Sequence, residues 1–440
     1  MMTVGIVSLG CSKNLVDSEI MLGLLDQNGY EFTNDPAGAE ILIVNTCCFI
    51  ESAQMESIEA ILEMAQYKQT GKCRLLIVAG CLSQRYRDEI LEEIPEIDIL
   101  LGTANYHEII DAINEYDKKT VRHFSDINFS PDYTGLPRYY TTPSYTGYLR
   151  ISDGCNNCCS YCVIPSIRGK YRSRNLPELL SEAEDMVRRG AKELIIIGQD
   201  TTKYGSDLGG DITLSTLLNE LCKLDGLKWI RVHYSYPEGI TDELIETIKT
   251  QDKICKYLDI PIQHCNDEIL KKMRRRYTKS ELTGLLKKLR REIPGLVIRT
   301  SIIVGFPGET EEQFDELCEF IQEQKFERGG VFAYSREDGT PAAKMPGQVS
   351  EEIKEKRQEI LMAQQSRIML NQNKKLVGSI EEVLVEGYEN DHYYGRRYAD
   401  SIEIDGTVYF PPEGFPVLPG DIVRVKINDF DETDLFGEIV

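Results

Sequence analysis

The sequence has no apolar run that is long enough to cross a membrane. Its longest apolar runs, such as Leu75–Ala79, have the length of a β-strand, whereas a spanning helix needs about 18 or more apolar residues. The first residues, MMTVGIVSLG, contain no basic segment followed by a long apolar stretch, so no secretory signal is predicted. We therefore expect a cytoplasmic protein that has no membrane partner.

Basic residues are scarce relative to acidic ones. The chain of 440 residues has 50 lysines and arginines against 72 aspartates and glutamates, which gives a formal net charge of -22. Such a surface repels the phosphates of nucleic acids unless the basic residues cluster locally. It is better suited to a basic partner, and we expect any contact with RNA to be secondary at most.

Cysteine, in contrast, is abundant. An odd number of cysteines, 13 in all, in a long chain without a secretory signal argues against a framework of disulfides. Clustered cysteines in such a chain are more often metal ligands, whereas isolated ones are usually small buried apolar residues. The second interpretation fits the scattered cysteines Cys73, Cys222, Cys255, Cys265 and Cys318.

Residues 1–117 alternate between short apolar runs and segments with the period of a helix. The runs that predict strands are Thr3–Leu9, Ile41–Thr46, Leu75–Gly80 and Ile97–Leu101. Helical periodicity covers Asp17–Asn28 and Glu51–Tyr67, which lie between these runs. This alternation predicts an α/β domain with a doubly wound parallel sheet, which has helices on both faces.

A second α/β domain is predicted after a linker. Residues 118–142 are polar, contain Pro131 and Pro137 and show no sustained period, so they predict the linker. Residues 143–349 then repeat the alternation in six longer units, which predicts an open (β/α)6 partial barrel. Its expected strands are Tyr148–Ser152, Glu193–Gly198, Trp229–Tyr234, Tyr257–Ile262, Val297–Val304 and Gly330–Tyr334.

The carboxyl-terminal part has a different pattern. A charged connecting helix is predicted over residues 350–373, and residues 374–440 contain short apolar runs separated by glycine and proline. These runs predict a small antiparallel β-barrel of about five strands. They are Ile380–Val385, Tyr393–Arg397, Thr407–Phe410 and Asp421–Ile427.

The segment DGCNNCCSYC, residues 153–162, contains the triplet Cys155, Cys159 and Cys162. This spacing allows one short loop to place three thiolates around one face of a four-iron cluster. Such clusters usually take four cysteines, so a triplet leaves one iron open for a small ligand. The triplet follows the first strand of the predicted barrel, at the mouth where barrels have their active sites. An open iron there suits S-adenosylmethionine, whose amino and carboxylate groups can chelate it.

Cys158 lies inside the triplet and leaves the choice of ligands open. Together with Cys155 it also has the spacing of a zinc half-site. A zinc site would need a second pair of cysteines or histidines, and the nearest histidines, His233 and His264, are isolated. We therefore favour the iron–sulfur cluster, with Cys158 as a spare thiol.

Cys11, Cys47 and Cys81 each follow a predicted strand, in GIVSLGC, ILIVNTC and LLIVAGC. The carboxyl ends of parallel strands share one edge of a sheet, which is where ligands bind. Three thiolates on adjacent loops of that edge can converge on one object, so we predict a second cluster that holds exchangeable sulfur. The alternatives are three buried structural cysteines, or Cys48 as the ligand in place of Cys47.

The triplet matches the signature of the radical S-adenosylmethionine superfamily, in which an aromatic residue, here Tyr161, precedes the last cysteine. The resemblance implies that the cluster cleaves S-adenosylmethionine to a carbon radical and that Tyr161 contacts the adenine. The run IVGFPGET, which includes Val304, resembles the strand segment that flanks the nucleoside in many members. Gln199 and Gln263 follow predicted strands, so they are candidates for binding the same cofactor or are ordinary loop residues.

The complete arrangement resembles the methylthiotransferase family, whose members have an amino-terminal three-cysteine domain, a central radical domain and a carboxyl-terminal TRAM barrel. The stretches SLGCSKNLVDSE (8–19), VIPSIRGKYRSR (163–174), GQDTTKYG (198–205) and YLDIPIQH (257–264) resemble the RimO type within that family. The resemblance implies two 4Fe–4S clusters, S-adenosylmethionine, an external electron donor and an external sulfur source. It also implies transfer of a methylthio group to the β-carbon of an aspartate in ribosomal protein S12. Beyond the clusters, the sequence identifies no catalytic residue.

Two other functions are compatible with parts of this pattern. A tRNA adenosine methylthiotransferase of the MiaB type uses the same chemistry but needs a basic face for RNA. Residues 374–440 contain 15 acidic and 6 basic residues, which favours a basic protein partner, although an acidic surface can also serve solubility alone. A non-catalytic iron–sulfur carrier or RNA-binding protein is disfavoured, because a passive cluster usually takes four thiolates.

Four basic residues near the triplet allow two interpretations. Arg168, Lys170, Arg172 and Arg174 would bind a carboxylate of the substrate or of S-adenosylmethionine, or they would form structural ion pairs.

Overall fold

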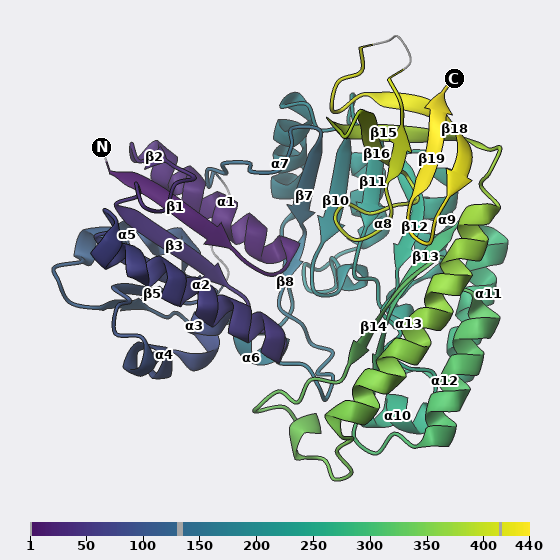
Figure 1. The fold of residues 1–440 in the computed structure, drawn as a ribbon, viewed down its shortest axis with the longest axis horizontal. Coiled ribbons are helices and arrows are strands. Elements are labelled where there is room, and N and C mark those ends of the chain that lie inside the picture. The colour runs from purple at the N-terminus through teal and green to yellow at the C-terminus, as the bar shows by residue number, and fades with distance from the viewer. Residues whose placement is uncertain (1, 130–134, 413–415) are drawn as a thin grey trace.

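The computed structural model describes residues 2–129, 135–412 and 416–440. Two parallel sheets with their helices and then a small barrel follow one another along the chain (Figure 1). Over this described part of the chain, no helix combines the length and the hydropathy needed to span a membrane.

The amino-terminal sheet has six strands, all parallel, in the order β2-β1-β3-β4-β5-β6. The strands are β1 (Thr3–Ser8), β2 (Glu31–Phe32), β3 (Ile41–Thr46), β4 (Leu75–Gly80), β5 (Ile99–Leu101) and β6 (Val121–His123). One face is covered by α1 (Ser12–Gln27) and α5 (Ile109–Glu115), and the other by α2 (Glu51–Thr70), α3 (Cys81–Tyr86) and α4 (Asp88–Glu93).

Alternate side chains of the central strands point to these two helical layers. Ile43 and Ile77 pack on the side of α1, whereas Leu42 and Leu76 pack on the side of α2. All four are almost completely buried, which is why the strands have continuous apolar runs in the sequence. The predicted doubly wound parallel sheet is therefore confirmed.

The edges of this sheet differ from the prediction. The sequence predicts neither β2 nor β6, and β6 lies inside residues 118–142, which are predicted to be a linker. Strands of two or three residues are too short to show a period, so their formation depends on the neighbouring strand.

α1 also begins at Ser12, five residues before the predicted start. Pro131 of the predicted linker lies outside the described residues.

The central sheet has six parallel strands in the order β14-β13-β12-β11-β10-β7, so it is open, with β7 and β14 at its edges. This confirms the predicted open (β/α)6 partial barrel. The strands are β7 (Thr146–Arg150), β10 (Glu193–Ile197), β11 (Trp229–Val232), β12 (Ile254–Asp259), β13 (Val297–Val304) and β14 (Arg328–Ala333). β8 (Ser152–Asp153) and β9 (Arg172–Ser173) form a separate two-stranded antiparallel sheet. The helices are α6 (Ile164–Arg168), α7 (Leu176–Arg188), α8 (Leu214–Leu221), α9 (Asp242–Thr250), α10 (Asp267–Lys272), α11 (Lys279–Glu292), α12 (Glu311–Gln324) and α13 (Glu351–Lys374).

The amino-terminal domain lies beside the open side of the central sheet and contacts it near both edges (Figure 1). At one edge, side chains of α1 share a hydrophobic core with Tyr148 of β7 and Ile195 of β10. Beyond the other edge strand, β14, Glu337 pairs with Arg85 of α3 at 2.7 Å. The two α/β domains therefore contact each other through a hydrophobic core at one edge of the central sheet and an ion pair beyond the other.

The carboxyl-terminal domain is a closed barrel of five strands. They are β15 (Ile380–Glu389), β16 (His392–Arg397), β17 (Val408–Phe410), β18 (Ile422–Phe430) and β19 (Leu435–Ile439), of which β19 is not predicted from the sequence. One pair, β17 and β19, is parallel, so the expectation of a purely antiparallel barrel is wrong in this detail.

The carboxyl-terminal barrel covers the amino-terminal ends of the central strands. Trp229 and Val297, the first residues of β11 and β13, pack against Leu384 and Tyr398 of the barrel. Behind them, the connection that follows β16 forms buried ion pairs with the central sheet, including Arg328 with Asp400 at 2.6 Å. The cysteine triplet follows β8, at the opposite ends of the central strands, and the connection after β16 also reaches that end, where Ser401 Oγ lies 2.9 Å from Nε2 of His233.

Candidate active site

Cys11, Cys47 and Cys81 follow β1, β3 and β4 and share one edge of the amino-terminal sheet, because β3 pairs in parallel with both of its neighbours. The strand order reverses between β1 and β3, and ligands bind at such reversals in doubly wound sheets. Gly10 has a φ of +85°, and a Cβ there would lie 2.8 Å from Cys47 Sγ. Glycine thus permits the close approach of the Cys11 loop to Cys47.

Asn14, in the first turn of α1, ties the three cysteine loops together. Its Nδ2 donates to the carbonyl oxygens of Leu9 at 2.9 Å and Thr46 at 2.8 Å. Its Oδ1 accepts from Cys81 Sγ at 3.8 Å. The side chain is almost completely buried, so these contacts are sheltered from water. Asn14 lies in the stretch 8–19 that resembles the RimO type, but nothing in the local sequence pattern marks it as a residue of the site.

Positive charge surrounds the amino-terminal cysteines. Burial by itself would raise the pKa of Cys11, but Lys13 and Arg168, with backbone hydrogen bonds, outweigh burial and lower that pKa. Burial raises the pKa of Cys81 to about 12 in spite of the opposing effect of Arg168. Lys13 itself lies 3.5 Å above the ring of Tyr234, which follows β11 of the central sheet.

Cys48 is oriented differently from Cys47. It is fully buried and belongs to the apolar core between the sheet and α2, with Val44 and Leu82. Burial also raises its pKa far above the usual value for a thiol. Cys47, in contrast, retains some exposure, with its backbone N–H donating to Ser57 Oγ at 3.0 Å.

The triplet lies on the loop that follows β8. Cys155 and Cys159 are buried and Cys162 is partly buried, whereas Cys158 is exposed and has a φ of +51°. The loop is fixed at its centre by Ser160, whose N–H donates to the carbonyl oxygen of Met273 at 3.1 Å. Burial raises the pKa of Cys155 to about 11.

Two side chains of the central domain contact Cys159 and were not identified from the sequence. Arg275 Nη1 lies 3.7 Å from Cys159 Sγ, as does the hydroxyl oxygen of Tyr236. Arg275 also stacks over the ring of Tyr236, with 4.3 Å between guanidinium and ring centre, and donates to the carbonyl oxygen of Pro261 at 2.6 Å. Nothing in the local sequence pattern marks these two residues, because they reach Cys159 from distant loops.

Three of the four residues predicted to bind S-adenosylmethionine have side chains that are partly exposed beside the triplet or at strand ends. Tyr161 packs edge-on against Phe306, with 6.4 Å between ring centres. Gln199 donates to Asp153 Oδ1 at 3.0 Å, and its Oε1 is buried without a hydrogen-bond partner among the described residues. Gln263 has a φ of +66° and is hydrogen-bonded through its backbone to β13.

Val304 differs from these three. Its side chain is fully buried in the core between the central sheet and its helices, so it faces away from the triplet. The preceding residue, Ile303, is on the opposite face of β13 and packs in the same cluster as Tyr161. Only the backbone of Val304 is therefore available for contact with a bound nucleoside.

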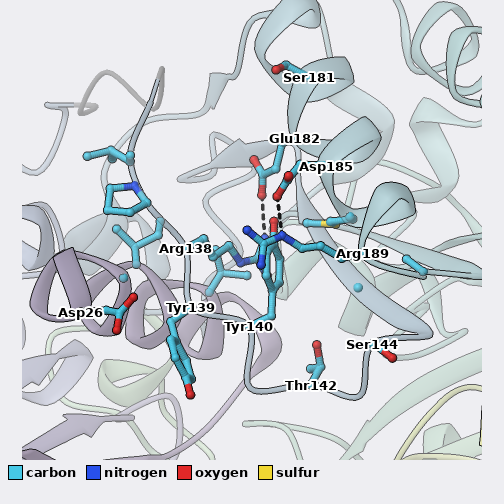
Figure 2. A pocket seen from close by; sticks show the side chains of 18 of the residues that line it. Asp26, Arg138, Tyr139, Tyr140, Thr142, Ser144, Ser181, Glu182, Asp185 and Arg189 are labelled. Atoms are coloured by element: carbon cyan, nitrogen blue, oxygen red, sulfur yellow. Dashed lines mark hydrogen bonds and ion pairs between the residues drawn. The ribbon is translucent and has the colours of Figure 1, made fainter. Parts of the chain in front are cut away.

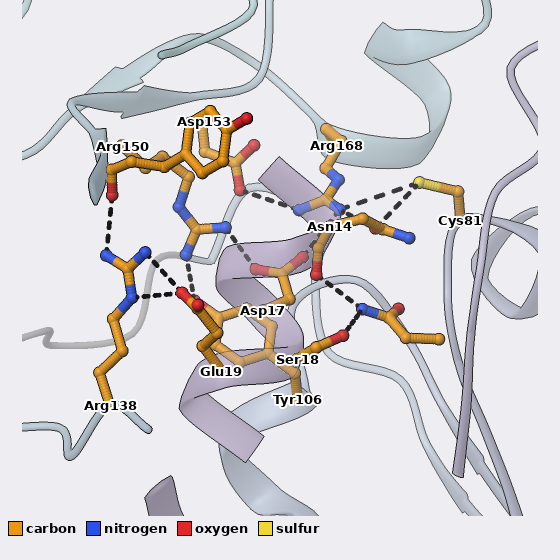
Figure 3. A network of polar contacts seen from close by, with 12 residues as sticks. Asn14, Asp17, Ser18, Glu19, Cys81, Tyr106, Arg138, Arg150, Asp153 and Arg168 are labelled. Atoms are coloured by element: carbon orange, nitrogen blue, oxygen red, sulfur yellow. Dashed lines mark hydrogen bonds and ion pairs between the residues drawn. The ribbon is translucent and has the colours of Figure 1, made fainter. Parts of the chain in front are cut away.

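Arg168 joins the two cysteine sites (Figure 3). Its Nη2 lies 2.8 Å from Asp17 Oδ2 and 3.8 Å from Cys81 Sγ, both in the amino-terminal domain. Its Nη1 lies 3.6 Å from Asp153 Oδ2, in the loop that leads into Cys155. All the charged groups in this network are buried. The network also includes Arg150, which pairs with the second oxygen of Asp17.

The remaining basic residues near the triplet have mostly structural contacts. Arg174 pairs with Glu182 at 2.6 Å, and Arg172 donates to the carbonyl oxygens of Lys170 and Arg168. Together with the pairing of Arg168, these contacts favour the interpretation of structural ion pairs over that of a carboxylate-binding cluster.

A cavity of about 900 Å³ lies elsewhere, between α1, α7 and residues 135–147 (Figure 2). Arg138 pairs with Glu182 there, and Arg189 pairs with Asp185. No cysteine is among the described residues that line it, so it is separate from the cysteine sites.

The cysteine sets do not form a site for a single metal ion. Within residues 2–129, 135–412 and 416–440, no three side chains of His, Cys, Asp or Glu converge on one ion. In a 4Fe–4S cluster each cysteine binds a different iron, so its ligands need not converge in this way.

Three family models match the chain. Residues 3–102 match the uncharacterized protein family UPF0004, residues 149–321 match the radical SAM superfamily, and residues 377–440 match the TRAM domain. Among curated proteins, the ribosomal protein uS12 methylthiotransferase RimO of Geobacter sulfurreducens is 52% identical over 99% of this chain and 98% of its own. The RimO proteins of Geotalea uraniireducens and Desulforamulus reducens are each 51% identical, the latter over 100% of both chains.

Solved structures share the fold at much lower identity. The radical S-adenosylmethionine methyltransferase TsrM from Kitasatospora setae is 14% identical, with a TM-score of 0.56 over 88% of this chain and 81% of its own. The cobalamin-dependent radical enzyme OxsB is 12% identical, with a TM-score of 0.50 over 82% of this chain and 56% of its own. The full-length identities and the three domain matches together show that the chain belongs to the RimO family of ribosomal protein uS12 methylthiotransferases, within the radical SAM superfamily.

Proposed function

We propose that this radical SAM enzyme transfers a methylthio group to the β-carbon of an aspartate in ribosomal protein uS12, and that it uses two 4Fe–4S clusters. The observation that supports this most directly is the relation between the two sets of cysteines. Each set lies at the carboxyl ends of the strands of its own parallel sheet, and Arg168 contacts both Cys81 and the loop before Cys155.

Six cysteines are proposed as the ligands. Cys155, Cys159 and Cys162 hold one cluster and Cys11, Cys47 and Cys81 hold the other, and each set leaves one iron for a ligand that is not protein. When bound, the first cluster supplies the electron that cleaves S-adenosylmethionine to a radical, and the second holds the sulfur to be transferred. Cys48 and Cys158 are not ligands in this proposal, because Cys48 is fully buried in the core with Val44 and Leu82, and Cys158 lies outside the spacing of the triplet Cys155, Cys159 and Cys162.

The protein's own groups hold and orient these partners. Asn14 fixes the three amino-terminal loops, and Arg275 with Tyr236 fixes Cys159. Gln199 Oε1 is a buried acceptor without a partner in the described chain, and leaving such a group unpaired costs about 1–3 kcal/mol. The amino group of S-adenosylmethionine is a suitable donor, so Gln199 fits the proposed cofactor, together with Tyr161, Gln263 and the backbone of Val304.

The charge of the carboxyl-terminal barrel supports a protein substrate over tRNA. Two of the six basic residues in 374–440, Arg396 and Arg397, are buried and paired with Glu193 and Asp400. They are therefore not available for phosphates, and the outer surface is left with an excess of acidic residues. A ribosomal protein that binds RNA is rich in lysine and arginine, so it suits such a surface.

The test combines iron analysis with a modification assay. Anaerobically reconstituted enzyme should lose about half of its iron and sulfide on Cys11→Ala and about half on Cys155→Ala. With a reductant, sulfide and S-adenosylmethionine, the wild type should add the mass of a methylthio group in place of one hydrogen on uS12. A single cluster would contradict the proposal, as would unmodified uS12 beside a modified tRNA adenosine. Absence of 5′-deoxyadenosine would indicate a passive iron–sulfur protein.

A further inference from the structure

Exposed apolar side chains are concentrated in one short stretch of the surface. Of the eighteen large apolar residues that are exposed in the described part of the chain, five lie within residues 49–62. They are Phe49 (46% exposed), Ile50 (36%), Met55 (57%), Ile58 (39%) and Leu62 (46%), and we call them the α2 face. Met55, Ile58 and Leu62 have the spacing i, i+3, i+7, so they lie on one side of α2. Contiguous apolar surface of this kind marks interaction sites.

The α2 face begins beside the proposed sulfur-holding site. Ile50 is three residues after Cys47, so their Cα atoms are at most about 11 Å apart. The first turn of α2 also contacts the central domain: Glu51 N–H donates to Ser335 Oγ at 3.3 Å, and Gln54 donates to Glu337 at 2.8 Å. The face therefore starts at the rim where the two α/β domains meet.

Acidic residues are interleaved with these apolar ones. Glu51, Glu56, Glu59 and Glu63 are exposed on α2, and no lysine or arginine occurs between residues 51 and 67. Such a surface attracts a partner that presents apolar side chains flanked by lysine or arginine, and it repels an acidic protein. The five apolar side chains of the α2 face are exposed, so a partner from solution can reach them.

We propose that the α2 face is the docking site for the polypeptide substrate, and that it binds a basic segment next to Cys47. This inference rests on the proposed function and adds to it the surface that delivers the protein substrate to the site. Two features of the α2 face support it. Its charge is complementary to that of a ribosomal protein, and its position is continuous with the cysteine-bearing edge of the amino-terminal sheet.

Binding of purified uS12 to the iron-reconstituted enzyme tests the proposal. Met55→Ser with Ile58→Ser removes the apolar part, and Glu56→Lys with Glu59→Lys reverses the charge. Each pair should raise the Kd for uS12 by about tenfold or more, as expected when anchors near the centre of an interface are lost. The charge-reversed enzyme should also lose most of the salt dependence of binding.

A matched control is available on α13. Ile360 and Met362 are exposed to similar extents, 44% and 37%, on a helix that packs against α12 and β14. Ile360→Ser with Met362→Ser should leave the Kd for uS12 unchanged. Iron content and thermal unfolding of all three variants should match those of the wild type, which shows that they fold.

The outcomes separate the two proposals. An unchanged Kd for uS12 in both α2 variants would overturn the docking inference while leaving the proposed function intact. Loss of self-association in the α2 variants, seen by sedimentation, would show that a second copy covers the face and would also overturn it. Failure of the wild type to bind or modify uS12 would instead refute the proposed function, and the docking inference with it.

Discussion

Asp17 of α1 and Arg168 of α6 form a buried ion pair, with 2.8 Å between Asp17 Oδ2 and Arg168 Nη2. The two residues belong to different domains, and each is six residues beyond a proposed cluster ligand, Cys11 and Cys162 respectively. Separation of the domains would break the contacts of Asp17 with both Arg168 and Arg150, and it would leave Arg168 with only its longer contact to Asp153. The pair therefore ties the helix that follows Cys11 to the segment that follows Cys162, and in the proposed function it holds the two cysteine sites in place relative to each other.

Arg168→Ala should destabilise the protein severely. It leaves Asp17 with only Arg150 as its partner and Asp153 without its contact to Arg168, and breaking a buried pair in this way costs about 3–5 kcal/mol. Urea unfolding measures the loss. Arg188→Ala is the matched control, because Arg188 pairs with Asp185 at an exposed site where such a pair contributes about 0–1 kcal/mol. Equal losses in the two variants would contradict the assigned role of Arg168.

Asn14→Ala should weaken the amino-terminal site selectively. Without the amide, the loops that carry Cys11, Cys47 and Cys81 lose their common anchor, so we expect bound iron to fall by up to about half. Iron analysis and the spectrum of the reduced protein would measure this. Asn28→Ala, at the exposed end of the same helix, removes only a hydrogen bond to Leu24 and should keep the iron.

Neighbouring cysteines should respond differently to substitution by serine. Cys47→Ser should lose about half of the iron, whereas Cys48→Ser should retain it, because Cys48 faces the apolar core. Cys159→Ser and Cys158→Ser form a second pair with the same expectation, since Cys158 lies outside the spacing of the proposed triplet. Iron and sulfide analysis after anaerobic reconstitution tests both pairs of variants. Retention of iron by Cys47→Ser with loss by Cys48→Ser would reverse the proposed ligand assignment.

Glu193 should make stability depend on acid pH. Burial by itself would raise the pKa of Glu193, but Arg396 and Arg231 lower it to about 2. Because the folded pKa lies below the unfolded value, the carboxylate stabilises the fold above about pH 5, and this stabilisation is lost as the pH falls towards 2. This lowering of the pKa of Glu193 corresponds to about 3 kcal/mol of stabilisation of the folded state.

The comparison of wild type with Glu193→Gln measures this contribution. The difference in their free energies of unfolding should shrink by about 3 kcal/mol between pH 5 and pH 2. Iron-free protein should be used, because the binding of metal to thiolates itself depends on pH. Glu323→Gln, at an exposed position on α12, should leave the pH profile of the wild type unchanged. A difference that stays constant with pH would contradict the assignment.

The sequence by itself determined the strands that position the cysteines. β3 and β4, which precede Cys47 and Cys81, have the bounds that their apolar runs predict, and the six proposed ligands could be found because each set follows strand ends. The physical reason is local: strands buried on both faces must be apolar throughout, and parallel strands end at one edge.

Only the tertiary structure decided how these parts are joined. The edge strands β2 and β6, the parallel pair of β17 and β19, and the outward orientation of Val304 all depend on neighbours that are distant in sequence. The contact between Asn14 and Arg168 spans 154 residues, and no periodicity within either segment encodes it. Periodicity shows which face of an element is buried, but the partner of a buried charge is set by the packing of whole domains.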